Sequence, residues 1–191
     1  MRLTRTVDPA ELPVSLDEAK QYCRIEHDDE NSLIESLIAA AVDYLDGPSG
    51  ILGRAIIAQQ WLLELDAWPN RLALPIEPVS SVTVRYIDEL GAETDVPESQ
   101  LVLTDVPSAR TVLEWIDGFQ VPLLSDKRYP VKITITSGFA AAANVPEGIK
   151  AAIKMMVGHW YDNRETVVLG MSVAELPMAV NALLARYRVM L

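Results

Sequence analysis

Hydrophobic residues in the first fifty positions of this sequence recur with a helical period. In "DDENSLIESLIAAAVDYLDGPSG" apolar side chains return every three or four positions, with polar residues between them. A glycine, a proline and a second glycine then interrupt the pattern. We therefore predict an amphipathic helix that ends before Gly47. Its apolar face comprises Leu33, Ile34, Leu37, Ile38, Ala41 and Leu45.

Helices are predicted on both sides of this pattern and near the C-terminus. Ser15 and Glu18 have capping-box spacing, so a short helix should begin at Leu16. Another should begin around Pro146 and run into "VGHWYDNRET". A last short helix is expected in "ELPMAVNALLARYRVML", with Pro177 near its first turn. Its apolar face comprises Val180, Leu183, Leu184 and Tyr187.

The period changes from about residue 55, where apolar and polar residues begin to alternate. Five segments have the pattern of short strands: "QQWLLELDAWP", "RLALP", "SSVTVRYIDELGAE", "TVLEWI" and "VKITIT". Seven of the 12 prolines lie between Pro69 and Pro130, as expected of short strands joined by shaped loops. The spacing predicts a small, mostly antiparallel sheet.

The order of the elements favours an α+β fold over a parallel α/β fold. We expect one domain over residues 1–191: a helical bundle with an inserted small, mostly antiparallel β-region. The N-terminal helices should lie within 14–47, the β-rich region with its loops within 55–137, and the C-terminal helices within 145–191.

Composition and charge narrow the possible functions. Half of the residues are hydrophobic, but no apolar run approaches the roughly 18–20 residues that cross a bilayer, and no secretory signal is visible. We therefore expect no membrane partner and synthesis in the cytoplasm. The net charge is −11, and residues 8–46 contain eleven acids against two bases. Such a charge argues against binding that neutralises many phosphates.

The densest group of chemically capable side chains includes His159, Asp162 and Glu165. Their spacing is not that of a zinc protease, and the other histidine, His27, lies in a distant polar segment. Ser172 lacks the surroundings of a nucleophile elbow. We predict no catalytic, metal or cofactor site. The favoured interpretation is packing by Met156 and Trp160, with Tyr161 at the boundary and Arg164 in ion pairs.

Five pieces in order carry a resemblance that covers nearly the whole chain. They are "SLDEAKQYCRIEHDDENSLIESLIAAAVDYLD", "GRAIIAQQWLLELDAWP", "LPIEPVSSVTVRYIDELG", "ITITSGFA" with "VPEGIKAAIKMMVGHWYDNRE", and "ELPMAVNALLARYR". In this order the sequence resembles the head–tail connector, or adaptor, family of tailed phages, also called phage DNA-packaging proteins. Gene transfer agents carry similar proteins.

The resemblance implies a non-enzymatic subunit of a ring, dodecameric when assembled, beneath the portal protein of a virion or phage-like particle. Such a ring extends the DNA channel toward the stopper or tail-completion protein, and DNA passes without specific binding. The family fold is a helical bundle with a small β-region. The alternatives are an assembly chaperone or a host-directed binding module. An enzyme would require His159 in a concave pocket.

Three surfaces are hypothesised to make the contacts of a connector. Portal docking is assigned to the end of the last helix, although that helix could instead simply close the bundle. A loop from Asp117 to Pro130 is assigned to a neighbouring subunit or tail component. An acidic face is assigned to the DNA channel, although it could simply be solvated. The portal-docking set is Leu183, Leu184, Arg186, Tyr187, Arg188, Met190 and Leu191. The loop set is Phe119, Val121, Leu123, Leu124, Lys127 and Arg128, and the acidic set is Glu35, Asp43 and Asp46.

Overall fold

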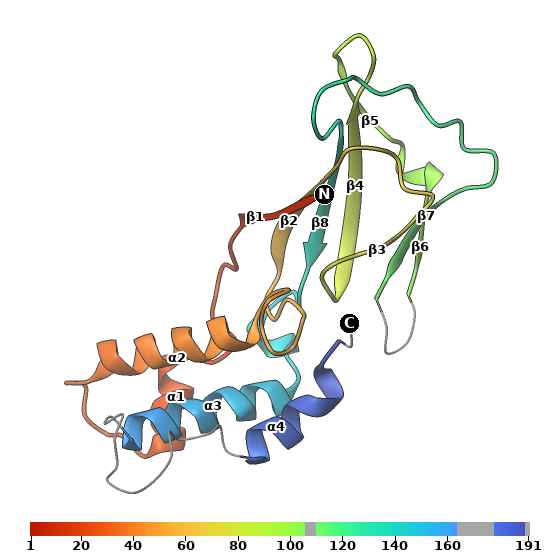
Figure 1. Cartoon of the computed structure of the whole chain (residues 1–191). Coiled ribbons are helices and arrows are strands. Elements are labelled where there is room, and N and C mark those ends of the chain that lie inside the picture. Colours follow the sequence, from red (N-terminus) through yellow and green to blue (C-terminus); the bar gives the residue numbers. More distant parts are fainter. Residues whose placement is uncertain (106–109, 164–177, 190–191) are drawn as a thin grey trace, which may run out of the picture. The chain divides into compact units, whose positions relative to one another are not determined.

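The chain divides into two compact units in a computed structural model that describes residues 1–105, 110–163 and 178–189 (Figure 1). The sheet unit comprises Met1–Ala10, Ala58–Gly138 and Val189–Leu191. The helical unit comprises Glu11–Ile57 and Phe139–Arg188. The predicted combination of helices with antiparallel sheets is confirmed. The N-terminal residues join the sheet unit, which the sequence patterns did not predict.

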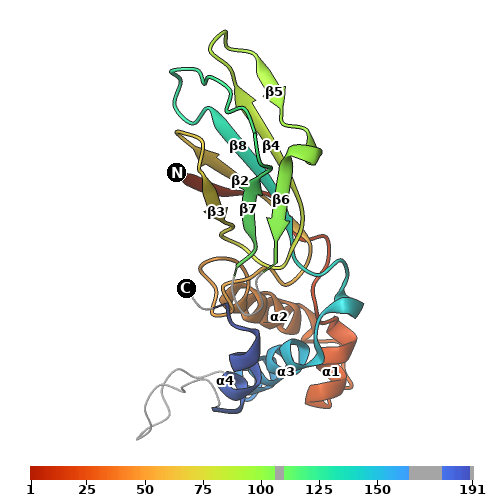
Figure 2. The ribbon, with the colours of Figure 1, turned by 90° about the vertical axis from the view of Figure 1, so that its right-hand side faces the viewer.

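The helical unit is organised around its longest helix. Its α-helices are α1 (Leu16–Cys23), α2 (Asn31–Leu45), α3 (Glu147–Asp162) and α4 (Met178–Leu184), and short 3-10 turns span Ala142–Asn144 and Ala185–Tyr187. Helix α3 packs against all three others and lies between α1 and α4 in Figure 2. It is central because one side is buried and mostly apolar, through Ile149, Ala152, Ile153, Met156 and Val157, with Lys150 also buried.

The start of α1 is the capping box that the sequence predicts. The Ser15 hydroxyl accepts a hydrogen bond from the Glu18 N–H at 3.2 Å, and the Glu18 carboxylate accepts one from the Ser15 N–H at 2.8 Å. The second bond lowers the pKa of Glu18, because a charged carboxylate is the better acceptor. Of the predicted apolar face of α2, Ile34, Ile38, Ala41 and Leu45 are buried, whereas Leu33 is 36% exposed because it lies at the margin of that face.

Two close approaches fix how the helices pack. The Tyr187 ring lies against Gly148, where an added Cβ would come within 2.8 Å of it. The Tyr22 ring and the Cys23 sulfur also lie near Gly158, but at 3.4 and 3.6 Å from such a Cβ, which is ordinary van der Waals contact. Both glycines lie on α3, so α1 and the segment after α4 can approach its backbone. Burial raises the pKa of Cys23, which keeps this thiol protonated.

The larger sheet has the strand order β1-β2-β8-β4-β5, and every pair is antiparallel. Its strands are β1 (Arg2–Val7), β2 (Gln59–Leu65), β8 (Val131–Ser137), β4 (Val79–Ile87) and β5 (Glu93–Asp95). The central strand β8 alternates buried and half-buried residues, and Val131, Ile133 and Ile135 are fully buried. Leu63 of β2 and Val84 of β4 lie opposite Ile133 on either side. This apolar row is the core of the sheet.

A smaller sheet has the order β3-β7-β6, from β3 (Arg71–Ala73), β7 (Val112–Trp115) and β6 (Leu101–Thr104). A 3-10 turn at Glu98–Gln100 precedes β6. All five predicted strands are present, but β1, β5 and β6 were missed. Strand β5 has three exposed polar residues, and neither β1 nor β6 alternates between buried and exposed positions. These three segments are strands because they pair with neighbouring strands, and the period of hydrophobic residues in the sequence does not predict such pairing.

A buried carboxylate ties the turn before β4 to the start of β7. Glu77 accepts hydrogen bonds from both the backbone N–H and the hydroxyl of Thr111, the latter at 3.1 Å. Both residues are only 7% exposed. The Thr111 carbonyl in turn accepts a bond from the Leu74 N–H at 2.8 Å. The smaller sheet is therefore held to the chain that leads into the larger one.

Replacing the α1 cap should destabilise the helical unit measurably. Ser15→Ala removes the acceptor for the Glu18 N–H, and caps of this kind contribute about 1 kcal/mol. Urea denaturation followed by circular dichroism should show that loss. Ser36→Ala, at an exposed position within α2, is the matched control and should shift stability by less than about 0.5 kcal/mol. Equal losses in both variants would contradict the capping role.

Glu77→Ala should cost about 1–3 kcal/mol, because the Thr111 N–H would lose its buried acceptor. The control is Glu114→Ala, which removes a half-exposed carboxylate 3.1 Å from Arg71 in the smaller sheet and should be nearly neutral. Thermal unfolding measures both. A Glu77→Ala protein as stable as the parent would show that the hydrogen bonds between Glu77 and Thr111 are dispensable.

Candidate interaction surfaces

The residues at the end of α3 act mainly as structural contacts. The Tyr161 hydroxyl donates a hydrogen bond to the Glu30 carboxylate, which links this end to the start of α2. Met156 is fully buried and Trp160 packs half-buried against the same core, as predicted. The His159 ring lies 3.4 Å from the Asn163 amide nitrogen. Asp162 ends the helix, whereas Arg164 and Glu165 lie outside the described residues.

Neither histidine lies in a metal-binding cluster within the described part of the chain. His27 Nε2 is 4.0 Å from Glu30, a weak contact on an exposed side chain. The buried Nε2 of His159 has no hydrogen-bond partner among the described residues. None of the described helices is long and apolar enough to span a membrane.

The predicted portal-docking residues divide between core and surface. Leu184 is buried together with Val180, so these two side chains hold α4 against the other helices. Leu183 and Tyr187 are half-buried. Arg186 and Arg188 are exposed; the Arg188 guanidinium donates to the Asn181 side chain at 2.8 Å, and that of Arg186 lies 5.2 Å from the Tyr187 ring. Met190 and Leu191 lie outside the described residues, as does Pro177.

The long loop from Asp117 to Pro130 is anchored by an aromatic cluster. Phe119 stacks on Trp115 at 4.8 Å between ring centroids, and Trp68 meets Trp115 edge-on at 5.3 Å and Tyr86 at 5.3 Å. The Trp68 indole donates to the Pro122 carbonyl at 2.9 Å. Phe119, predicted to meet a partner, therefore serves first as an anchor. The sequence shows these aromatics far apart, and only the fold brings them together.

Beyond this anchor the loop presents apolar and basic side chains. Val121 is 60% exposed and Leu123 is 69% exposed. The second half of the loop returns to β4: the Ser125 N–H donates to the Ile87 carbonyl at 3.0 Å, and Leu124 forms a β-bridge with Asp88. Lys127 and Arg128 are exposed, and the Arg128 guanidinium lies 4.8 Å from the Tyr129 ring. A fixed loop can present these groups with little loss of entropy.

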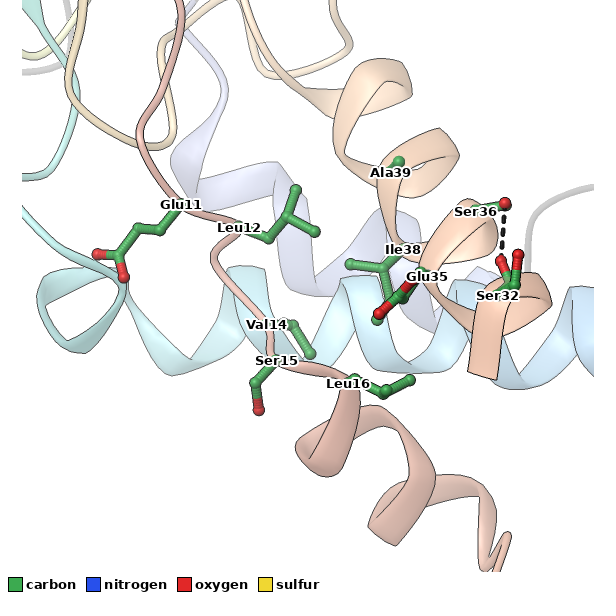
Figure 3. Close-up of a pocket in the computed structure, with 10 residues that line it drawn as sticks. All are labelled: Glu11, Leu12, Val14, Ser15, Leu16, Ser32, Glu35, Ser36, Ile38 and Ala39. Carbon is green, nitrogen blue, oxygen red and sulfur yellow. Dashed lines mark hydrogen bonds between the residues drawn. The ribbon is translucent and has the colours of Figure 1, made fainter. Parts of the chain in front are cut away.

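The three acidic candidates have different environments. Asp46 is half-buried, and its carboxylate accepts the Ile56 N–H at 2.7 Å, so it terminates α2 and holds the following loop. Asp43 is exposed on α2. Glu35 is also exposed and lines an open groove of about 630 Å³ between α2 and the segment before α1 (Figure 3). Glu11 also lines the groove, and the remaining lining is apolar or carries hydroxyl groups, including Leu12, Leu16, Ile38, Ser32 and Ser36.

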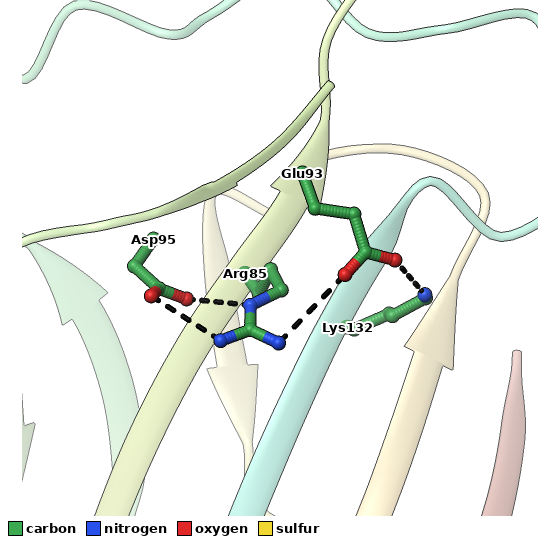
Figure 4. Close-up of polar contacts among 4 residues, drawn as sticks. All are labelled: Arg85, Glu93, Asp95 and Lys132. Carbon is green, nitrogen blue, oxygen red and sulfur yellow. Dashed lines mark hydrogen bonds and ion pairs between the residues drawn. The ribbon is translucent and has the colours of Figure 1, made fainter. Parts of the chain in front are cut away.

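An ion cluster that the sequence patterns did not reveal fastens the short strand β5 (Figure 4). Arg85 on β4 contacts Asp95 at 2.7 Å and Glu93 at 3.7 Å, and Lys132 on β8 contacts Glu93 at 2.6 Å. The hydrogen bond from Lys132 lowers the pKa of Glu93, and the one from Arg85 lowers the pKa of Asp95. The cluster follows from register, because Arg85 lies opposite both Asp95 and Lys132.

The helical start and the β-region together match a known family. Residues 13–105 match the family model described as phage gp6-like head-tail connector protein. No curated protein sequence is significantly similar to the chain. Among solved structures, a chain in "Virion of native gene transfer agent (GTA) particle" is 25% identical. The alignment covers 100% of this chain and 96% of that chain, with a TM-score of 0.78.

Two further structures have the same coverage. A chain in "Neck of empty GTA particle computed with C6 symmetry" is again 25% identical with a TM-score of 0.78. A chain in "Neck of native GTA particle computed with C12 symmetry" is 24% identical with a TM-score of 0.71, which bears on the fold alone.

Residues 13–105 thus match the phage gp6-like head–tail connector family model, and the resemblance predicted from sequence is confirmed. The similarities confirm a structural connector subunit and give no support to a chaperone or a host-directed module.

Removing the central ring of the aromatic cluster should release the loop. Trp68→Ala deletes contacts to Trp115 and Tyr86 and the bond to the Pro122 carbonyl. Proteolysis after Lys127 or Arg128 should then become at least about tenfold faster, because local opening requires less free energy. Leu90→Ala, at a position 89% exposed, is the control and should leave the rate unchanged. An unchanged rate in Trp68→Ala would contradict the anchoring role.

Proposed function

We propose that the chain forms a closed ring at the head–tail junction of a tailed phage or phage-like particle, where the ring extends the DNA channel. The observation that carries this proposal is similarity over the full length to chains of gene transfer agent particles, two of them described as neck structures with C6 or C12 symmetry. A ring of twelve copies fits both symmetries. One face would meet the portal protein and the other a stopper or tail-completion protein.

The proposed role is structural and requires no cofactor. The family is a structural component of virions, which favours a protein that is not an enzyme. The four helices would act as a bundle that keeps each subunit rigid. The large buried faces of α3 support this, since they leave the unit little freedom to deform.

The acidic face of α2 would lie toward the passing DNA. Close contact between like charges is unfavourable, so carboxylates along a channel keep DNA from adsorbing. Asp43 is the best candidate, because it is exposed and the structure gives it no capping role. Asp46 is less suitable because its carboxylate holds Ile56. Glu35, in its groove, could contribute from the margin of that face.

Portal docking would use the exposed arginines after α4, with Leu184 and Val180 supporting them from the core. The predicted loop, through Val121 and Leu123, would meet a neighbouring subunit or the next tail component. Truncation before α4 is a poor test of docking, since it removes Val180 and Leu184 from the core. Surface substitutions separate docking from folding.

The ring is tested by negative-stain microscopy of the purified chain mixed with the portal protein of the same particle. An added ring beneath the portal is expected, even if the free chain is monomeric. A soluble, folded chain that never adds a layer to the portal would overturn the proposed function. A small oligomer without portal affinity would favour the chaperone alternative.

Arg186→Glu combined with Arg188→Glu should weaken portal binding by roughly tenfold or more, because rim charges control docking. Circular dichroism should show unchanged helix content, since both side chains are exposed. Arg24→Glu, an exposed arginine at the end of α1, is the matched control. Unaltered portal binding by the double variant would instead assign α4 to closing the helical unit.

A further inference from the structure

Four strands end the two sheets of the sheet unit within the described residues: β1 and β5 in the larger sheet, and β3 and β6 in the smaller one. Two of them, β1 and β6, lie at opposite sides of that unit. Strand β1 ends the larger sheet and pairs only with β2 within the described residues, and β6 ends the smaller sheet and pairs only with β7. In Figure 1, β1 and β6 lie at opposite sides of the sheet unit. Each offers a row of backbone N–H and C=O groups to another chain.

Strand β6 lacks the usual protection of an edge strand. Its sequence, "LVLT", contains no charge and no proline, which are the residues that commonly prevent edge-to-edge pairing. Val102 and Leu103 point to opposite faces of the strand, as successive residues must, yet they are 39% and 43% exposed. Within the part of the chain that the structure describes, both faces and the outer edge of β6 are therefore open. Such an apolar strand on a stable protein indicates a partner that adds a strand.

Charge distinguishes the two edges. Strand β1 carries Arg2 and Arg5, whose side chains are 62% and 40% exposed and make surface pairs with Glu64 and Asp8. Strand β6 is flanked by exposed carboxylates, Glu98 in the turn before it and Asp105 directly after it. A basic edge and an acid-flanked edge attract each other, whereas two copies of either edge would repel. The charges thus favour a heterologous contact over a two-fold symmetric one.

Ring symmetry makes these edges suitable partners for each other. A rotation about the ring axis keeps each patch at constant height and radius, so neighbours join most simply through opposite sides of the same unit. The β1 and β6 edges meet this condition within the sheet unit alone. They also leave the charged face of α2 and the arginines after α4 free for other contacts.

We propose that β1 of one subunit adds to the open edge of β6 in the next copy of this chain, so that the sheets join around the ring. This inference rests on the proposed ring and names its subunit interface. The occupant of each edge is a second copy. The apolar face at Leu103 would then pack against the neighbour's strand, and Arg2 and Arg5 would lie near the carboxylates that flank β6.

Cross-linking in assembled rings tests the contact directly. In a Cys23→Ser background, Val7→Cys and Leu103→Cys place thiols on β1 and β6 at positions 48% and 43% exposed. A short bismaleimide should convert portal-bound rings into a ladder of covalent multimers. The control pairs Val7→Cys with Ala39→Cys, an exposed position on α2 of the helical unit, and should give no ladder.

A charge exchange gives an independent readout. Arg2→Glu with Arg5→Glu, and separately Glu98→Arg with Asp105→Arg, should each weaken ring assembly on the order of tenfold. The four substitutions together should restore assembly to within about threefold of the parent, because opposite charges face each other again. Glu89→Arg, in the exposed turn before β5, changes charge without touching either edge and is the control. Thermal unfolding of each variant separates assembly from folding.

The outcomes distinguish this interface from the ring itself. Rings that are visible by microscopy but give no ladder, or no recovery on charge exchange, overturn the β1–β6 contact while the connector function stands. If the parent chain forms no ring on portal, the proposed function fails and the interface fails with it. A ladder in the test pair and its absence in the control pair support the contact.

Discussion

The pairing of the central strand β8 with β2 on one side and β4 on the other is the interaction on which the architecture depends. Its fully buried residues, Val131, Ile133 and Ile135, supply the apolar row that both neighbours cover. The same pairing sets Gln59 opposite Ser137. The chain therefore leaves the first helices and returns to the last ones at adjacent positions, so residues 58–138 form a closed insertion between them.

The insertion explains how much of the fold the sequence could predict. Period alone was sufficient for α2, α3, β4 and β8, because each buries one side of a regular element. The capping residue Ser15 located α1 to the residue. The hydrophobic period did not predict β1 and β6, because these strands form through hydrogen bonds to a neighbouring strand and bury no face of their own. The N-terminal strand is the extreme case, since its partner β2 lies more than fifty residues away.

The functional candidates show a related limit. Residue type marked Phe119, Leu184 and Asp46 as potential contacts, and all three are engaged within the chain: one in an aromatic stack, one in the core, and one on a backbone N–H. Side chains that share a sequence stretch with them, such as Leu123 and Arg186, are exposed. A sequence can indicate that a segment contains residue types suited to intermolecular contacts. Only packing divides its residues between internal support and external contact.

The contact between Tyr187 and Gly148 bears on the position of the arginines after α4. Because Gly148 has no side chain, the outer end of the Tyr187 ring packs directly on the α3 backbone. A Gly148→Ala substitution would place a methyl group within 2.8 Å of the Tyr187 ring. It would displace the outer end of the Tyr187 side chain, which lies between Arg186 and Arg188 in the sequence, without altering the charge of either arginine.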